Sequence, residues 1–118
     1  MANDKDFVVA GAVEVGKDTK VTLGTVTSNN IDLATGNYFA DTLAADTTYT
    51  ISNAGDVQAF QLEVTGASTY TITWPSSIEW AGGIAPSAPA TGETDVYTLV
   101  TDDGGTSYVG VKTADNLS

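Results

Sequence analysis

The 118-residue chain contains no cysteine, no histidine and no arginine. Without cysteine it forms no disulfide and offers no thiolate to zinc or to a substrate. Without histidine it lacks the imidazole base that activates most serine and cysteine nucleophiles. No other catalytic constellation is evident among the acidic residues. We therefore expect a protein that is not an enzyme and that has no cofactor.

Positive charge and long apolar runs are also scarce. Four lysines stand against fifteen acidic residues, which gives a formal net charge of −11. Nucleic acids and anionic membrane surfaces are bound through clustered cations, so we expect neither as a partner. The longest apolar or glycine run covers residues 7–13, far short of the roughly 20 residues that span a bilayer. The polar, acidic residues 1–6 do not resemble a secretory signal, and we expect a soluble protein.

Threonine is the commonest residue, and short β-branched or aromatic runs alternate with glycine, asparagine and aspartate. Residues 60–64 and 70–74 show strict apolar alternation, which is typical of half-buried strands. No window has the period of a helix as long as three turns. The sequence therefore predicts an all-β fold, an antiparallel β-sandwich of jelly-roll type with about eight short strands.

The turn residues between the runs suggest how the strands connect. Residues 60–64 and 70–74 are predicted to form one antiparallel hairpin, and residues 96–100 and 108–111 another, across Asp102-Asp103-Gly104-Gly105. The polar tail at 113–118 is expected to fray. Further strands are predicted at 7–15, 21–26, 31–33, 38–43 and 49–52.

Residues 75–94 are predicted to be a long loop, because three prolines and Gly82-Gly83 exclude a central strand. We expect three apolar side chains of this loop to pack against the rest of the domain and hold the loop in place: Ile78, Trp80 and Ile84. The expected organisation is an N-terminal arm or strand pair over residues 1–30, followed by a β-sandwich over residues 31–118.

Three ordered segments resemble a β-rich module that recurs in bacteriophage virion proteins, especially those of phages of aquatic bacteria. They are IDLATGNYF at 31–39, TYTITWPSSIEWAGGIAP at 69–86, and a closing segment with DVY at 95–97 and DGGTSYVG at 103–110. The similarity covers roughly residues 31–112. The family often has Trp then Tyr where this chain has Tyr108 and Val109, which alters one aromatic position.

The resemblance implies a non-enzymatic structural domain on the outer surface of a phage particle, often oligomeric. Tail fibres with this module usually carry a further shaft or attachment domain. This small acidic chain is therefore expected to be a capsid decoration (cement) protein, a homotrimer that binds the major capsid protein or another virion protein. The alternative is a tail-fibre or tail-tip module that recognises host glycans.

Candidate partner contacts lie in the proline-rich loop, at Trp80, Ile84 and Pro86, and in the arm, at Phe7 and Val9. Loops that project from a rigid scaffold are common sites of binding.

Two other groups of residues have alternative interpretations. Trp74 and Trp80 form either a sugar-stacking platform or anchors of the core and the loop. The turns at residues 102–105 and 53–56 either bind Ca²⁺ through clustered oxygens or serve as ordinary turns, and neither has the spacing of a defined calcium loop.

Overall fold

A five-stranded sheet is the largest element of the computed structural model, which describes residues 21–118. Its strand order is β3-β6-β9-β10-β8, and the central strands β6, β9 and β10 pair antiparallel. The two edge strands, β3 and β8, pair in parallel with their neighbours. The strands are β3 (Tyr38–Thr42), β6 (Gln58–Thr65), β8 (Ile78–Trp80), β9 (Thr94–Thr101) and β10 (Tyr108–Leu117).

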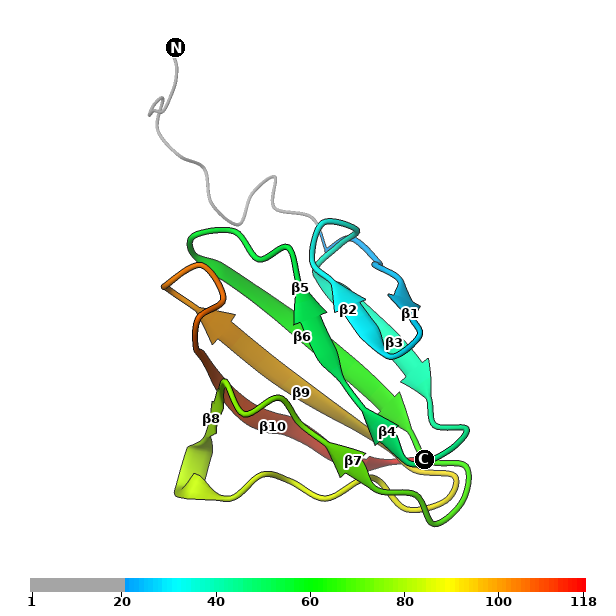
Figure 1. Cartoon of the computed structure of the whole chain (residues 1–118). Coiled ribbons are helices and arrows are strands. Elements are labelled where there is room, and N and C mark those ends of the chain that lie inside the picture. Colours follow the sequence, from blue (N-terminus) through cyan, green and yellow to red (C-terminus); the bar gives the residue numbers. More distant parts are fainter. Residues whose placement is uncertain (1–20) are drawn as a thin grey trace.

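A second layer of shorter strands lies over one face of this sheet (Figure 1). It contains β1 (Val26–Thr27), β2 (Asn30–Asp32), β4 (Thr47–Thr48), β5 (Thr50–Ser52) and β7 (Ile72–Thr73). Only Tyr49 separates β4 from β5, so one extended segment pairs with β7 at its start and with β2 at its end. The predicted all-β sandwich is confirmed.

The finer jelly-roll topology is not confirmed. A jelly roll is built from antiparallel Greek keys, whereas four strand pairs of this structure are parallel: β2 with β5, β3 with β6, β4 with β7 and β8 with β10. Residues 21–118 form ten strands, since the single strand expected at 49–52 is replaced by β4 and β5, and the loop expected at 75–94 contains β8.

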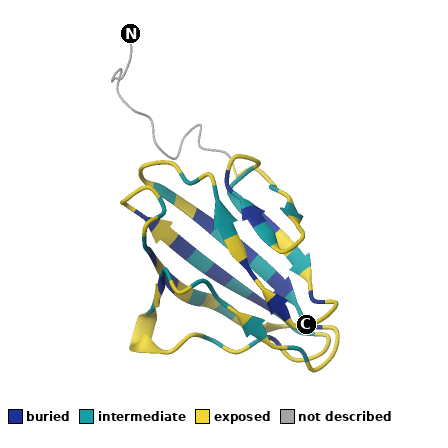
Figure 2. Ribbon diagram, viewed as in Figure 1, coloured by how far each residue is buried: buried dark blue, intermediate teal, exposed yellow. Residues whose placement is uncertain are grey.

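The core lies between the two layers, and Figure 2 shows buried residues alternating with more exposed ones along the long strands. Phe60, Leu62 and Val64 of β6 and Tyr97 and Leu99 of β9 are all buried. Side chains of period two enter the core from one face of a strand. The alternation predicted for residues 60–64 is therefore confirmed.

The predicted hairpin between residues 60–64 and 70–74 is wrong. β6 pairs with β3 and β9 in the large sheet, whereas β7 pairs with β4 in the other layer. Both segments alternate because each turns one face toward the same core, and alternation does not identify a strand's partner. The second predicted hairpin, between β9 and β10, is confirmed.

The loop predicted over residues 75–94 contains β8 and a short 3₁₀ turn at Ala81–Gly83. β8 lies at an edge of its sheet, in agreement with the exclusion of a central strand.

The predicted strand at 7–15 lies outside the described residues. Residues 28–29 make a two-residue turn with positive φ between β1 and β2, which is the geometry of a type I′ hairpin. On either side of this turn, Thr27 pairs with Asn30.

The tail is not frayed, because β10 continues to Leu117. The Asp95 carboxylate, 1% exposed, holds this end of the strand. It accepts a hydrogen bond from the backbone N–H of Asn116 at 2.9 Å and forms an ion pair with the Lys112 ammonium at 3.4 Å. Lys112 also contacts Asp115 at 3.2 Å. Burial works against the charge of Lys112, but its carboxylate partners prevail and raise its pKa.

Replacing this cation should destabilise the fold, since Lys112 is the lysine paired with a buried carboxylate. We expect Lys112→Met to lower the free energy of unfolding by about 2 kcal/mol, because the buried Asp95 loses its ion-pair partner. Urea unfolding measures the change. The double variant Asp95→Asn/Lys112→Met removes both charges and should recover most of the loss. Equal stability of Lys112→Met and the unmodified protein would contradict this role.

Candidate functional site: an uncharged aromatic groove

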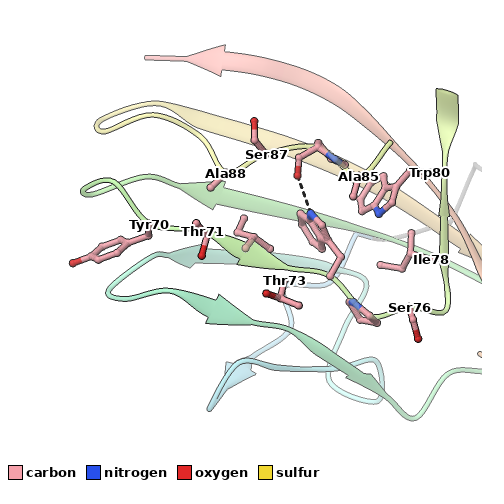
Figure 3. Close-up of a pocket in the computed structure, with 13 residues that line it drawn as sticks. Tyr70, Thr71, Thr73, Ser76, Ile78, Trp80, Ala85, Ser87 and Ala88 are labelled. Carbon is pink, nitrogen blue, oxygen red and sulfur yellow. Dashed lines mark hydrogen bonds between the residues drawn. The ribbon is translucent and has the colours of Figure 1, made fainter. Parts of the chain in front are cut away.

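A groove of about 630 Å³ opens between β7 of the small layer and β8 of the large sheet (Figure 3). The segment 85–88 crosses it and forms one wall. The lining comprises Tyr70, Thr71, Ile72, Thr73, Trp74, Pro75, Ser76, Ile78, Trp80, Ala85, Pro86, Ser87 and Ala88.

No lining residue carries a charge, although eleven of the fifteen acidic residues fall within residues 21–118. The groove offers aromatic faces and the hydroxyl groups of threonine, serine and tyrosine. Such a surface suits a neutral ligand that stacks and forms hydrogen bonds. None of its lining residues has a carboxylate, imidazole or amine side chain.

Trp74 forms part of the groove and part of the core. Its ring stacks on Tyr49 with a centroid distance of 5.6 Å and meets Tyr97 edge-on at 4.8 Å. Its indole N–H donates a hydrogen bond to the Pro86 carbonyl at 3.0 Å, drawn as the dashed line in Figure 3. This bond ties the proline-rich segment to the end of β7. The geometry favours the interpretation of Trp74 as an anchor, with one edge left at the groove.

Trp80 is half-buried and packs against Gly110 of the neighbouring strand. A Cβ atom at Gly110 would lie 2.9 Å from ring carbons of Trp80 and 2.9 Å from a methyl group of Ile78. The ring also meets Trp74 at 5.0 Å and Tyr97 at 6.0 Å. Its indole nitrogen is buried and has no hydrogen-bond partner within residues 21–118. Trp80 therefore holds the loop through ring packing.

Burial raises the pKa values of the two tyrosines that contact Trp74, Tyr49 and Tyr97. Desolvation raises the pKa of Tyr49, and the hydrogen bond that its hydroxyl donates to Asp41 at 2.6 Å raises it further. Desolvation also raises the pKa of Tyr97, with a smaller contribution from the nearby Asp95. Both hydroxyls stay protonated across the physiological pH range.

The predicted partner contacts have different surroundings. Trp80 and Pro86 line the groove, whereas Ile84 is 79% exposed beside it. Ile78 and Trp80 pin the segment to the body, but the expectation that Ile84 does so is wrong, because its side chain projects into solvent. Phe7 and Val9 lie outside the described residues.

Several groove residues were missed from the sequence, among them Tyr70, Thr73 and Ser87. The hairpin prediction placed residues 70–74 beside β6, away from the proline-rich segment. One signal was available: Glu79 is the only charged residue between positions 69 and 92. In so acidic a chain, a stretch of 24 residues with a single charge indicates a surface that carries little charge.

Two of the residues considered as calcium ligands, Asp103 and Asn53, form side-chain hydrogen bonds within the protein. The Asp103 carboxylate accepts hydrogen bonds from the Ser107 hydroxyl at 2.6 Å, the Ser107 N–H at 2.9 Å and the Thr101 hydroxyl at 2.8 Å. These donors lower the pKa of Asp103 to about 2. The Asn53 side chain donates to Asp32 at 2.8 Å. Across residues 21–118, no group of three or more acidic side chains is placed to hold a metal ion.

Comparison with protein-family models, with curated proteins and with solved structures finds no match to this chain. In the part of the chain that the structure describes, no helix is both long and apolar enough to cross a bilayer.

A substitution at Gly110 tests the packing of Trp80 against this residue. We expect Gly110→Ala to lower the free energy of unfolding by about 1–3 kcal/mol, because the added methyl group displaces Trp80 and Ile78. The tryptophan emission maximum should also shift. Gly55→Ala is the matched control, since a Cβ at Gly55 meets only Gln58 at 3.5 Å. If both variants unfold alike, Trp80 does not pack as described.

Proposed function

We propose that this protein is a non-enzymatic structural accessory protein of a phage virion, and that it serves as a capsid decoration protein. The observation that carries the proposal is the convergence of the segments that resemble the virion module. Trp74 and Trp80 come from the second segment and Tyr97 from the third, and their rings contact one another. Phe39, from the first segment, packs edge-on against Phe60 in the same core. The resemblance therefore concerns residues that cooperate in one fold.

The surface supports a role in binding. A decoration protein stabilises a shell by burying area where subunits meet, and it needs no reaction centre. The acidic body suits a basic patch on a shell exterior. The exposed Ile84 beside the groove supplies an apolar contact. The proposed partner is the major capsid protein or another virion protein on the outer surface of the particle, bound by a homotrimer.

The groove itself favours a second candidate function, host recognition at a tail fibre or tail tip. Its aromatic faces and hydroxyl groups match the chemistry of neutral glycans. Nuclear magnetic resonance titration with neutral oligosaccharides tests this candidate through the indole signals of Trp74 and Trp80. Shifts confined to groove residues would support glycan recognition, and unchanged spectra in the millimolar range would contradict it.

Substitution of Ile84 tests the decoration proposal without disturbing the core. Trp80→Ala is less suitable, because Trp80 packs within the aromatic cluster. We expect Ile84→Ser to keep the melting temperature and to weaken binding to the shell about tenfold, because it removes one apolar contact. Val57→Ser is the control, since Val57 is 74% exposed and lies outside the groove.

Cryo-electron microscopy of virions that carry each variant measures the occupancy of the domain. Density at capsid junctions that weakens only in Ile84→Ser agrees with the proposal. Density confined to the tail would contradict the decoration proposal, and equal occupancy on the head in both variants would contradict the role of Ile84 in binding.

A further inference from the structure

The outer face of the large sheet, opposite the core, bears a row of exposed valines. Along β9 and β10 the inward side chains alternate with Val100, Val109 and Val111, which are 41%, 61% and 41% exposed. Val109 lies directly across from Val100, and Val100 lies across from Ala59 of β6. We call Val100, Val109 and Val111 the outer valine patch. Clustered apolar side chains on an exposed sheet face are typical of a docking surface.

The chain enters the sandwich beside this patch. Val21 shares a hollow of about 180 Å³ with Ala59, Gln61 and Thr98. Thr98 lies across from Val111 in the β9–β10 pair. The backbone N–H of Gly24 donates to the Tyr38 carbonyl at 2.8 Å, which fixes the entering segment along β3. The described part of the chain therefore begins, at Val21, at the rim of the outer face.

The distance from this entry point to the patch is short. Residues 16–20 span at most about 17 Å when extended. Neighbouring strands lie about 4.8 Å apart, so the way from β6 across β9 to β10 is about 10 Å. A segment that ends at residue 15 can thus lie over the outer valine patch of its own molecule.

The amino acids before residue 16 match the patch in chemistry. Between positions 7 and 15, Phe7, Val9, Val13 and Val15 stand at odd positions with Gly11 between them, so in an extended segment these four side chains would share one face. Three of the four lysines, at positions 5, 17 and 20, flank this segment. The outer face carries carboxylates on both sides of the patch, since Glu63 alternates with buried β6 residues and Glu79 lies across from Val109.

We propose that residues 7–15 dock on the outer valine patch of the same molecule. The tether through residues 16–20 gives the segment a high effective concentration at its own sheet, which favours this arrangement over docking on a second copy. Apolar contact with the valines supplies the attraction, and Lys5, Lys17 and Lys20 carry the charge opposite to that of Glu63 and Glu79. The inference concerns the free protein and does not depend on a role in the virion.

The absence of cysteine allows a direct test by disulfide trapping in the 118-residue chain. The test variant is Val9→Cys/Val109→Cys, oxidised with copper phenanthroline. We expect an intramolecular disulfide that forms at least about tenfold faster than in the control Val9→Cys/Ile84→Cys, in which the second thiol is exposed outside the patch. Non-reducing electrophoresis and peptide mass spectrometry identify the product.

A further variant separates docking from simple proximity. Val13→Asp added to the test variant should reduce the rate to that of the control, because the charge opposes apolar docking. Equal rates in the test variant and the control, or no effect of Val13→Asp, would overturn the proposal. A disulfide that forms mainly between a Val9→Cys molecule and a Val109→Cys molecule would overturn it in favour of docking between copies.

Discussion

The contact between the two tryptophans and Tyr97 is the constraint on which the open edge of the sandwich depends. Trp74 comes from the small layer, Trp80 from an edge strand of the large sheet and Tyr97 from its centre, and the ring centroids lie between 4.8 and 6.0 Å apart. Buried aromatic rings supply much apolar contact area with defined geometry. Here they join β7 and β8, which belong to different sheets. Trp80 also packs against Gly110, and the Trp74 indole donates a hydrogen bond to Pro86. These two interactions connect the aromatic contact to the proline-rich segment.

The acidic side chains leave two areas of the surface uncharged, the groove and the outer valine patch. Net negative charge keeps a small domain soluble and suppresses association of like molecules. The groove lining is uncharged, and exposed valines gather on the outer sheet face. A binding protein needs such neutral areas because burying an unpaired carboxylate is costly. The buried Asp95 illustrates the cost, since it is paired with Lys112 and a backbone N–H.

Local features of the fold could be predicted from the sequence, and long-range ones could not. The alternation at 60–64 identifies a buried face, and Asp103-Gly104 identifies the turn between β9 and β10, because both depend on neighbouring residues. The partner of residues 70–74 depends on β4, which alternation does not specify. The polar composition of residues 113–118 predicts a frayed tail. The residue that orders this tail, Asp95, lies far away in sequence, so the local pattern does not reveal it. The groove was missed for the same reason, because β7, β8 and residues 85–88 meet only in the folded protein.

Hydrogen exchange of the Trp74 indole N–H is the most direct test of the aromatic contact as the link between the layers. The chain has two tryptophans, so both indole signals can be resolved and followed by nuclear magnetic resonance. The account predicts that the Trp74 proton exchanges with the same opening free energy as backbone amides of β6 and β9, because its bond to Pro86 breaks only when the sandwich unfolds. Exchange at a much lower opening free energy would contradict the account, since the proline-rich segment would then open independently of the core.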